Sequence, residues 1–216
     1  MPMIRIWAYL LNLIIQARGT LKMNEVIQNI LTRRSIRTYK EEQISDEQLN
    51  IILEAGKYAP SGGNSQTWRF TVVQSKEKIE QLNSLVRKAF KNLEVDEKTY
   101  RSKKSGKKAA ESDNYKFYYN APTLIIVSND REYSNCMADC AVSIENILLG
   151  AHSMGLGGCF LNQLTWFCDD KNVRKALTDI KIPENYIVCG SAAVGYNLGS
   201  ISKAAPRKEG TVDIIR

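Results

Sequence analysis

A run of arginine and hydroxyl side chains early in the chain has the composition of an anion-binding site. Arg33, Arg34 and Arg37 stand with Ser35 in a stretch where a helical pattern ends. Guanidinium groups bind phosphate through paired N–H donors, and a neighbouring hydroxyl adds another donor. The stretch therefore predicts a phosphate site with one cation left for a second charge. Arginines are also favoured at a helix C-terminus by the helix dipole alone, so a solvated helix end is the simpler alternative.

A second polar stretch, APSGGNSQTWRF at residues 59–70, separates a predicted helix from a predicted strand. Pro60 restricts the backbone, and Gly62 with its neighbouring glycine allows a ligand to approach the main chain. Ser61 and Asn64 supply short donors and acceptors that suit a polar, planar ligand. The same residue types occur in ordinary helix-to-strand connections, and the loop taken alone favours that interpretation.

Four blocks of sequence together resemble the FMN-dependent nitroreductase family. They are RRSIRTY at residues 33–39, APSGGNSQTWRF at 59–70, GLGGCFLNQ at 155–163 and PRK at 206–208. The blocks stand in the family's order and cover most of the chain from residue 23 onward. The resemblance implies an α+β fold with a central, mostly antiparallel or mixed sheet flanked by helices. It also implies an intertwined homodimer with FMN at the interface.

The resemblance implies which residues hold the FMN phosphate. Arg33, Arg34 and Ser35 match the family block that binds the phosphate and the ribityl chain. Arg207, with Lys208, would complete the phosphate clamp from the end of the chain. Two separate segments are therefore expected to meet at one phosphate.

The resemblance also implies residues around the flavin ring. Arg37 matches a position at the pyrimidine side, where a cation stabilises the negative charge of the reduced ring. The other expected cofactor-binding residues are Pro60, Ser61, Gly62 and Asn64 from the partner subunit, and Leu161, Asn162 and Gln163 near flavin N5. Flavin N5 carries the hydride in this family, so no side chain is expected to act as an acid or base.

The expected function is an FMN-dependent oxidoreductase that takes hydride from NADH or NADPH and reduces a nitroaromatic, a quinone or a similar acceptor by a ping-pong mechanism. A specialised flavin reaction such as reductive dehalogenation is an alternative within the family. A non-catalytic FMN-binding or storage protein is an alternative outside it. The net charge of +7 makes nucleic-acid binding a further alternative. It ranks last because no recognition motif is present.

Cysteine and histidine usage favours a reduced, cytoplasmic protein that binds no metal. The chain has five cysteines and one histidine, with no CxxC pair and no ligand spacing around His152. An odd number of cysteines without a secretory signal is typical of free thiols, most of them buried. No serine or cysteine stands beside His152 in a nucleophile context, so we expect a structural role for it.

The length of 216 residues suits one compact domain, which we place at residues 23–216. Residues 1–22 lie ahead of the family resemblance and are interpreted as an N-terminal extension or a misassigned start. Their apolar run, residues 4–15, is interrupted by Arg5 and Asn12. It falls short of the ~20 apolar residues that a membrane span needs. No membrane partner is expected.

Local patterns predict most of the helices and strands. Asn24 caps a first helix, and Ser45 with Gln48 forms a capping box for a second that stops before Pro60. Strands are expected at residues 70–73, 123–127, 158–161 and 186–196, a helix opening at residue 75, and a buried helix at about 133–153. The basic run at 98–108 is interpreted first as a mobile, solvated surface, and second as a lid or an attractor for nicotinamide phosphates.

Overall fold

The structure is a computed structural model that describes residues 24–201 and 203–216. The chain divides into two units, of which the first ends at Thr32 and the second runs from Arg33 to Arg216. The described part of the first unit is helix α2 (Glu25–Thr32). As predicted, Asn24 caps it, because its Oδ1 accepts a hydrogen bond from the Ile27 amide at 3.0 Å. The predicted extension at residues 1–22 lies outside the described residues.

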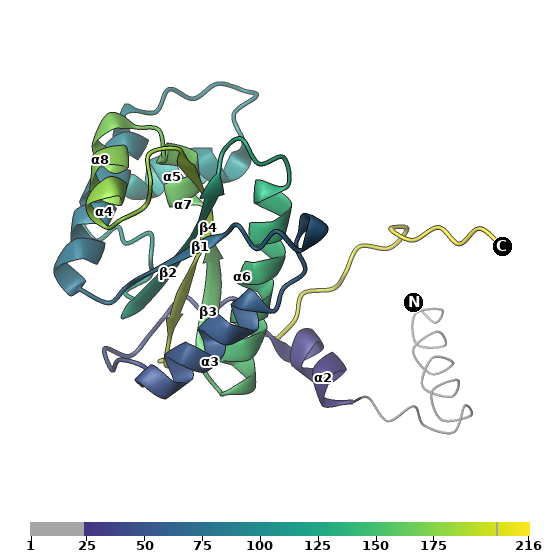
Figure 1. Ribbon diagram of the computed structural model, residues 1–216. Helices are drawn as coiled ribbons and strands as arrows, with labels where there is room; N and C mark the ends of the chain where they lie inside the picture. The colour runs from purple at the N-terminus through teal and green to yellow at the C-terminus, as the bar shows by residue number, and fades with distance from the viewer. Residues whose placement is uncertain (1–23, 202) are drawn as a thin grey trace, which may run out of the picture. The chain divides into compact units, whose positions relative to one another are not determined.

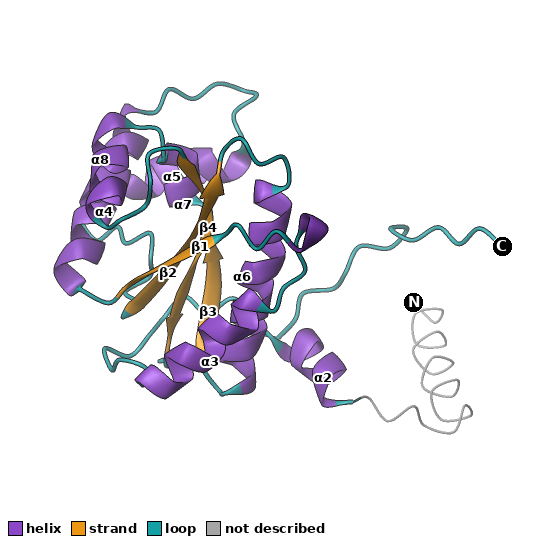
Figure 2. Cartoon of the chain, in the orientation of Figure 1, coloured by secondary structure: helices purple, strands orange, loops and turns teal. Residues whose placement is uncertain are grey.

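The second unit is built on one four-stranded sheet (Figure 2). Its spatial order is β1 (Arg69–Val73), β2 (Thr123–Asp130), β4 (Tyr186–Gly195) and β3 (Gly157–Leu161). All three neighbouring pairs are antiparallel. The strands β1 and β3 therefore form opposite edges of the sheet, a placement that no strand's own sequence specifies.

Helices cover both faces of the sheet, as Figure 1 shows. One face carries α4 (Lys76–Asn92), α5 (Arg101–Ala110), α7 (Gln163–Phe167) and α8 (Lys171–Asp179), and the other carries α3 (Asp46–Lys57) and α6 (Cys136–Ser153). The predicted α+β class with an antiparallel sheet between helices is confirmed.

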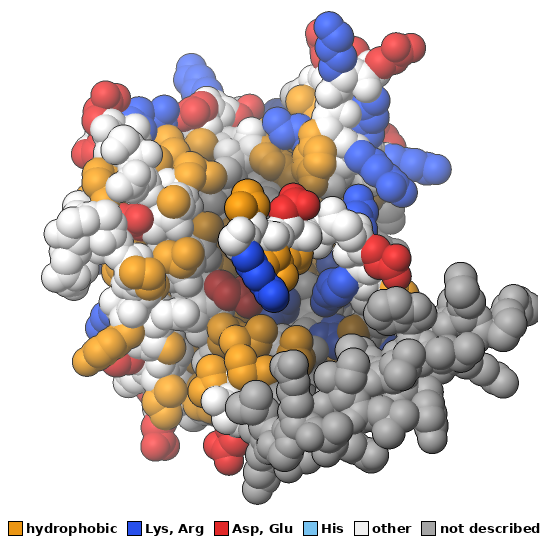
Figure 3. Space-filling model, turned by 90° about the vertical axis from the view of Figure 1, so that its right-hand side faces the viewer, with side chains coloured by type: hydrophobic (Ala, Val, Ile, Leu, Met, Phe, Trp, Pro, Cys, Tyr) orange, Lys and Arg blue, Asp and Glu red, His pale blue; other side chains and the backbone are white. Residues whose placement is uncertain are grey.

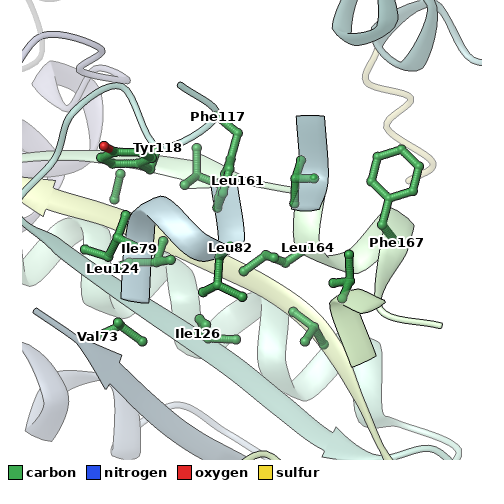
Figure 4. Packing of buried hydrophobic residues seen from close by; sticks show 14 of the residues in the cluster. Val73, Ile79, Leu82, Phe117, Tyr118, Leu124, Ile126, Leu161, Leu164 and Phe167 are labelled. Carbon is green, nitrogen blue, oxygen red and sulfur yellow. The ribbon is translucent and has the colours of Figure 1, made fainter. Parts of the chain in front are cut away.

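The central residues of strand β2, 124–127, are all apolar because both faces of the strand are covered. Leu124 and Ile126 point into the hydrophobic cluster under α4, whereas Ile125 and Val127 point into the cluster under α3 and α6. Successive strand side chains alternate between faces, so a strand between two helical layers needs apolar residues at every position. Figure 4 shows the first cluster, with Ile126 beside Leu82 and Leu124 beside Ile79, both of α4.

The predicted caps determine where the helices begin and end. Ser45 and Gln48 make both hydrogen bonds of the capping box at the start of α3. The Ser75 hydroxyl accepts from the Lys78 amide at 3.3 Å and so caps α4. Helix α6 ends just before Gly155, whose φ of 75° lies in the left-handed region that favours glycine.

Two short helices after β3 were not predicted. Helix α8 is capped by Asp170, whose Oδ1 accepts from the Asn172 and Val173 amides at 2.9 and 3.1 Å. Its buried residues Val173, Ala176 and Leu177 have helical spacing, so the signal was present in the sequence. Helix α7 has five residues and is too short to show a period.

The five cysteines are buried and free, as expected for small apolar side chains. In the part of the chain that the structure describes, no helix is long and apolar enough to cross a bilayer. Within the same residues, no group of three or more His, Cys, Asp or Glu side chains is arranged to hold a metal ion.

Candidate functional site

The arginine block, residues 33–37, runs along the outer edge of strand β3. Ser35 forms a parallel bridge with Gly158, and the Ile36 amide donates to the Gly158 carbonyl at 3.0 Å. The approach is close at Gly157, where an added Cβ would lie 2.8 Å from Cγ2 of Ile36. The absence of a side chain at Gly157 therefore lets the block lie directly against the strand.

Arg33 has the surroundings of an anion-binding group. Its Nε lies 3.5 Å from a carboxylate oxygen of Glu145 on α6. Its Nη1 is buried, and no described residue accepts a hydrogen bond from it. A buried donor without a partner is costly, and a charged one more so. The residues of the block therefore fit a phosphate group, which would satisfy this donor.

The pKa of the one histidine, His152, reflects the positive charge of the arginine block. Burial lowers the pKa of His152, and the positive charges of Arg33 and Arg34 lower it further. The imidazole is consequently neutral at pH 7. Its position on α6 beside the block agrees with a structural role, and the surroundings favour an anion over a cation there.

Arg37 lies at the far end of the block from Arg33, against an aromatic ring. Its guanidinium carbon is 5.7 Å from the ring centroid of Tyr119, within the range of a cation–π contact. Tyr39 anchors the segment, because its hydroxyl donates to the Ile36 carbonyl at 2.7 Å and lies 3.3 Å from the Ala193 carbonyl. Tyr39 thus anchors the backbone of this segment, and Tyr119 packs against the exposed Arg37 side chain.

The predicted N5 segment is at the other end of the same strand. Leu161 ends β3, three residues beyond Gly158, which is about 10 Å along a strand. The Asn162 amide donates to the side-chain oxygen of Gln163 at 3.1 Å. One strand therefore brings the arginine block and the segment 161–163 into the reach of a single elongated ligand.

A cavity of about 760 Å³ has Gln163 of the second segment in its wall, and no residue of the arginine block lines it. It is lined by Arg101, Ser102, Ser105, Gly106, Ala109, Ser112, Asn114, Tyr115, Lys116, Phe117, Tyr119, Gln163 and Trp166. Tyr119 connects it to Arg37, and Gln163 connects it to the end of β3. Sequence reasoning missed the aromatic wall, although the cluster YKFYY at residues 115–119 was visible.

The glycine loop is docked on the start of α6. It forms a single turn, η1 (Gly62–Asn64), and the Gly62 amide donates to Oδ2 of Asp139 at 3.1 Å. The loop packs closely there, because a Cβ at Gly62 would lie 2.3 Å from the side-chain nitrogen of Asn135, which would have to move. Asp139, which sequence reasoning missed, is 6% exposed and holds the loop in place.

The loop and the arginine block do not meet within one chain. The loop leads into β1, and the block lies along β3, so they lie at opposite edges of the sheet. Three strand spacings separate the edges, which amounts to about 14 Å before any offset along the strands. Pro60, Ser61, Gly62 and Asn64 are therefore not brought to the arginine block of their own chain.

The expected phosphate clamp from the chain end is not assembled either. Arg207 and Lys208 are exposed. The Arg207 guanidinium donates to the Ala205 carbonyl at 3.1 Å. In the part of the chain that the structure describes, neither residue makes an ion pair with the block or a hydrogen bond to it. Their role at the phosphate stays a prediction.

Comparison with known families decides how this arrangement is classified. A family model described as "Nitroreductase family" matches residues 30–196, which include the arginine block, the glycine loop and strand β3. The chain belongs to the nitroreductase family.

Individual members of the nitroreductase family are similar over most of the chain. A solved nitroreductase with bound FMN from Bacteroides fragilis has 43% identity and a TM-score of 0.81, covering 89% of this chain and 100% of its own. An Archaeoglobus fulgidus protein with an NADH dehydrogenase/NAD(P)H nitroreductase name is 31% identical over 81% of this chain and 86% of its own. An iodotyrosine deiodinase from Thermotoga neapolitana is 28% identical over 58% and 67%.

Proposed function

We propose that the protein is an FMN-dependent oxidoreductase that uses NADH or NADPH to reduce a nitroaromatic, a quinone or a similar small acceptor. The observation that carries this proposal is the buried, unpartnered donor of Arg33 in a cationic block on the strand that leads to the cavity. The 43% identical relative that holds FMN supports it over nearly the whole chain.

Each part of the block has its own task in this proposal. Arg33, Arg34 and Ser35 bind the FMN phosphate, whose charge satisfies the buried Arg33 donor. Arg37 places a positive charge beside the pyrimidine edge of the ring, where reduction adds negative charge. The segment 161–163 positions the ring edge at the cavity. Bound FMN supplies the redox chemistry by accepting hydride from reduced nicotinamide and passing two electrons to the acceptor.

The complete site forms in a homodimer. Ser61 and Asn64 of one subunit would approach the flavin held by the arginine block of the other, because their own block lies at the opposite sheet edge. The face of the molecule that carries α3 and α6 supports such an association. Figure 3 shows hydrophobic side chains gathered on this side, and Ile51, Met137 and Val142 are 49%, 45% and 41% exposed.

The test is spectroscopic and kinetic. The purified full-length protein should show a flavin absorption spectrum, and denaturation should release FMN. It should oxidise NADH or NADPH when a quinone or nitroaromatic is added, with parallel double-reciprocal plots that indicate a ping-pong mechanism. A colourless protein that fails to bind added FMN would overturn the proposal.

Two other functions remain as outcomes of the same experiment. Tight FMN binding without NAD(P)H turnover would indicate a storage protein. Reductive dehalogenation is supported by the similarity to an iodotyrosine deiodinase, which covers 58% of this chain, less than the nitroreductase relatives do. Release of iodide from 3-iodotyrosine, with no reduction of quinones or nitroaromatics, would assign that reaction instead.

A further inference from the structure

The basic run at residues 98–108 forms one wall of the cavity. It was expected first to be a mobile, solvated surface, but residues 101–110 form helix α5. The face of α5 toward the cavity carries small side chains: Ser102, Ser105, Gly106 and Ala109. Helix α5 therefore borders the cavity, and Arg101 and Lys108 on it are exposed to solvent, so both interpretations of the basic run stay predictions.

Packing and two of the lysines fix the position of α5. Gly106 lies so close to Phe90 of α4 that a Cβ would be 2.5 Å from Cζ of the ring. The Lys107 ammonium donates to the carbonyls of Lys91 and Leu93 at 2.9 and 2.7 Å. Lys104 donates to the Glu97 carbonyl at 2.9 Å. These two ammonium groups bind backbone oxygens at the end of α4 and in the loop that follows it, and so hold α5 to both.

The remaining charges at the cavity are positive. Arg101 lines it and makes no ion pair with any described residue. Lys103 places its ammonium 6.0 Å from the ring centroid of Trp166, which also lines it. Lys116 is a lining residue too, but its ammonium binds both carboxylate oxygens of Glu80 at 2.6 Å. Within the described chain, no Asp or Glu lines the cavity.

A neutral donor accompanies these cations. The Tyr115 hydroxyl is buried, and no described residue forms a hydrogen bond with it. Burial raises the pKa of Tyr115, so the phenol stays protonated and can donate at neutral pH. Together with the rings of Tyr119 and Trp166, it gives the cavity aromatic walls and an unused donor, which suit a planar molecule with an acidic substituent.

We propose that Arg101, supported by Lys103, makes this cavity selective for planar aromatic acceptors that carry an anionic group such as a sulfonate. The inference rests on the proposed function, because it assigns the substrate class of the same site. Arg101 acts as a specificity residue: it binds the anionic group at the cavity while the aromatic ring occupies the end toward Gln163 and Tyr119.

Two probes of nearly the same shape test the inference. 4-Nitrobenzenesulfonate carries one negative charge at pH 7, and 4-nitrobenzenesulfonamide carries none. The FMN-loaded full-length protein should reduce the sulfonate with a kcat/KM several-fold higher than that of the sulfonamide. The preference should shrink as salt is raised from 10 to 500 mM, because added ions screen a partly exposed charge pair.

Variants on α5 assign the preference to a residue. Arg101→Gln should lower kcat/KM for the sulfonate by roughly threefold to fivefold, as expected for a partly exposed ion pair, and leave the sulfonamide unchanged. Lys108→Gln is the matched control, since Lys108 is exposed on the same helix and does not line the cavity. Equal kcat/KM values for the two probes, or an equal loss with both in Arg101→Gln, overturns the inference.

A binding measurement separates this inference from the proposed function. Nitroaromatics quench tryptophan fluorescence, and Trp166 lies in the cavity wall, so titration reports binding without turnover. Trp166→Phe should remove most of the quenching. Tighter binding of the sulfonate with no reduction of either probe overturns the proposed function but supports the cavity's selectivity. Reduction of both probes with no charge preference in binding or turnover supports the proposed function and overturns the cavity's selectivity.

Discussion

His152 is the chain's only histidine, and its imidazole lies in the field of the arginine block. In a tag-free apoprotein it therefore gives one imidazole signal by NMR, with a pKa below the usual value of about 6.5. Adding FMN should raise this pKa, because the phosphate offsets the charges of Arg33 and Arg34. Riboflavin is the matched control: it lacks the phosphate and should leave the pKa unchanged.

The same shift makes a small contribution to the pH dependence of stability. The unfolded chain binds the His152 proton more tightly than the folded chain, so the free energy of unfolding falls as pH drops below about 6.5 toward the lower folded pKa. No such contribution exists at pH 8, where the imidazole is neutral in both states. For the FMN titration, an equal pKa of His152 with and without FMN would show that the phosphate does not bind at the arginine block.

Arg37 and Arg207 should differ in what they stabilise. Arg37→Gln removes a charge assigned to the reduced ring, so it should lower the flavin reduction potential by about 30 mV, equivalent to roughly 1.4 kcal/mol for two electrons. Arg207→Ala should instead weaken FMN binding and leave the flavin reduction potential unchanged, because the phosphate is charged in both redox states. Potentiometric titration and FMN dissociation measure the two effects, and similar changes in both variants would contradict the assignment.

At the scale of elements, the contact between the arginine block and β3 depends on Gly157. Gly157→Ala would push a methyl group against Ile36, and overpacking of this kind typically costs about 1–3 kcal/mol of unfolding free energy. Because the block itself must move, FMN affinity should fall as well, by about tenfold for each 1.4 kcal/mol of displaced contact.

A matched variant separates this loss of geometry from general destabilisation. Val173→Ala in α8 leaves a cavity in the core and should cost a similar amount of stability, about 2 kcal/mol. Val173 is not part of the candidate site, so FMN affinity should persist in that variant. Chemical denaturation of the apoproteins and FMN titration supply both quantities. If Gly157→Ala binds FMN as tightly as the wild type, the block is not held by this contact.

At the scale of the whole molecule, the two halves of the site lie at opposite edges of the sheet, and in the proposed dimer the loop of one subunit would complete the site of the other. One variant, Arg33→Ala with Arg37→Ala, damages the block, and another, Ser61→Leu with Asn64→Leu, damages the loop. Each homodimer should be nearly inactive. A mixed dimer gathers both lesions in one site and leaves the other intact, so subunit exchange should restore up to about half of wild-type activity.

Mixing two differently tagged copies of the block variant is the control, and it should restore nothing. Verified heterodimers of the block and loop variants that remain inactive would show that the loop does not act on the partner's flavin. The experiment uses the full chain and depends only on the symmetry of a twofold dimer.

The sequence by itself determined the local elements and the composition of the site. Ser45 with Gln48, Ser75 and Gly155 mark helix ends through hydrogen bonds or backbone angles that involve only neighbouring residues. The apolar run of β2 indicates a strand buried on both faces for the same local reason. The family resemblance supplied the arginine block and the glycine loop as cofactor-binding candidates.

Only the tertiary structure decided which of these segments meet. Strand order placed the glycine loop and the arginine block at opposite edges, and it brought Tyr119 against Arg37 and α5 against the cavity. The sequence of helix α5 has no apolar periodicity. The helix is held instead by the close packing of Gly106 on Phe90 and by hydrogen bonds from lysines to backbone carbonyls elsewhere in the chain. Such contacts join residues that are far apart in the chain. Periodicity and capping patterns involve only neighbouring residues, so they cannot predict which distant residues come into contact.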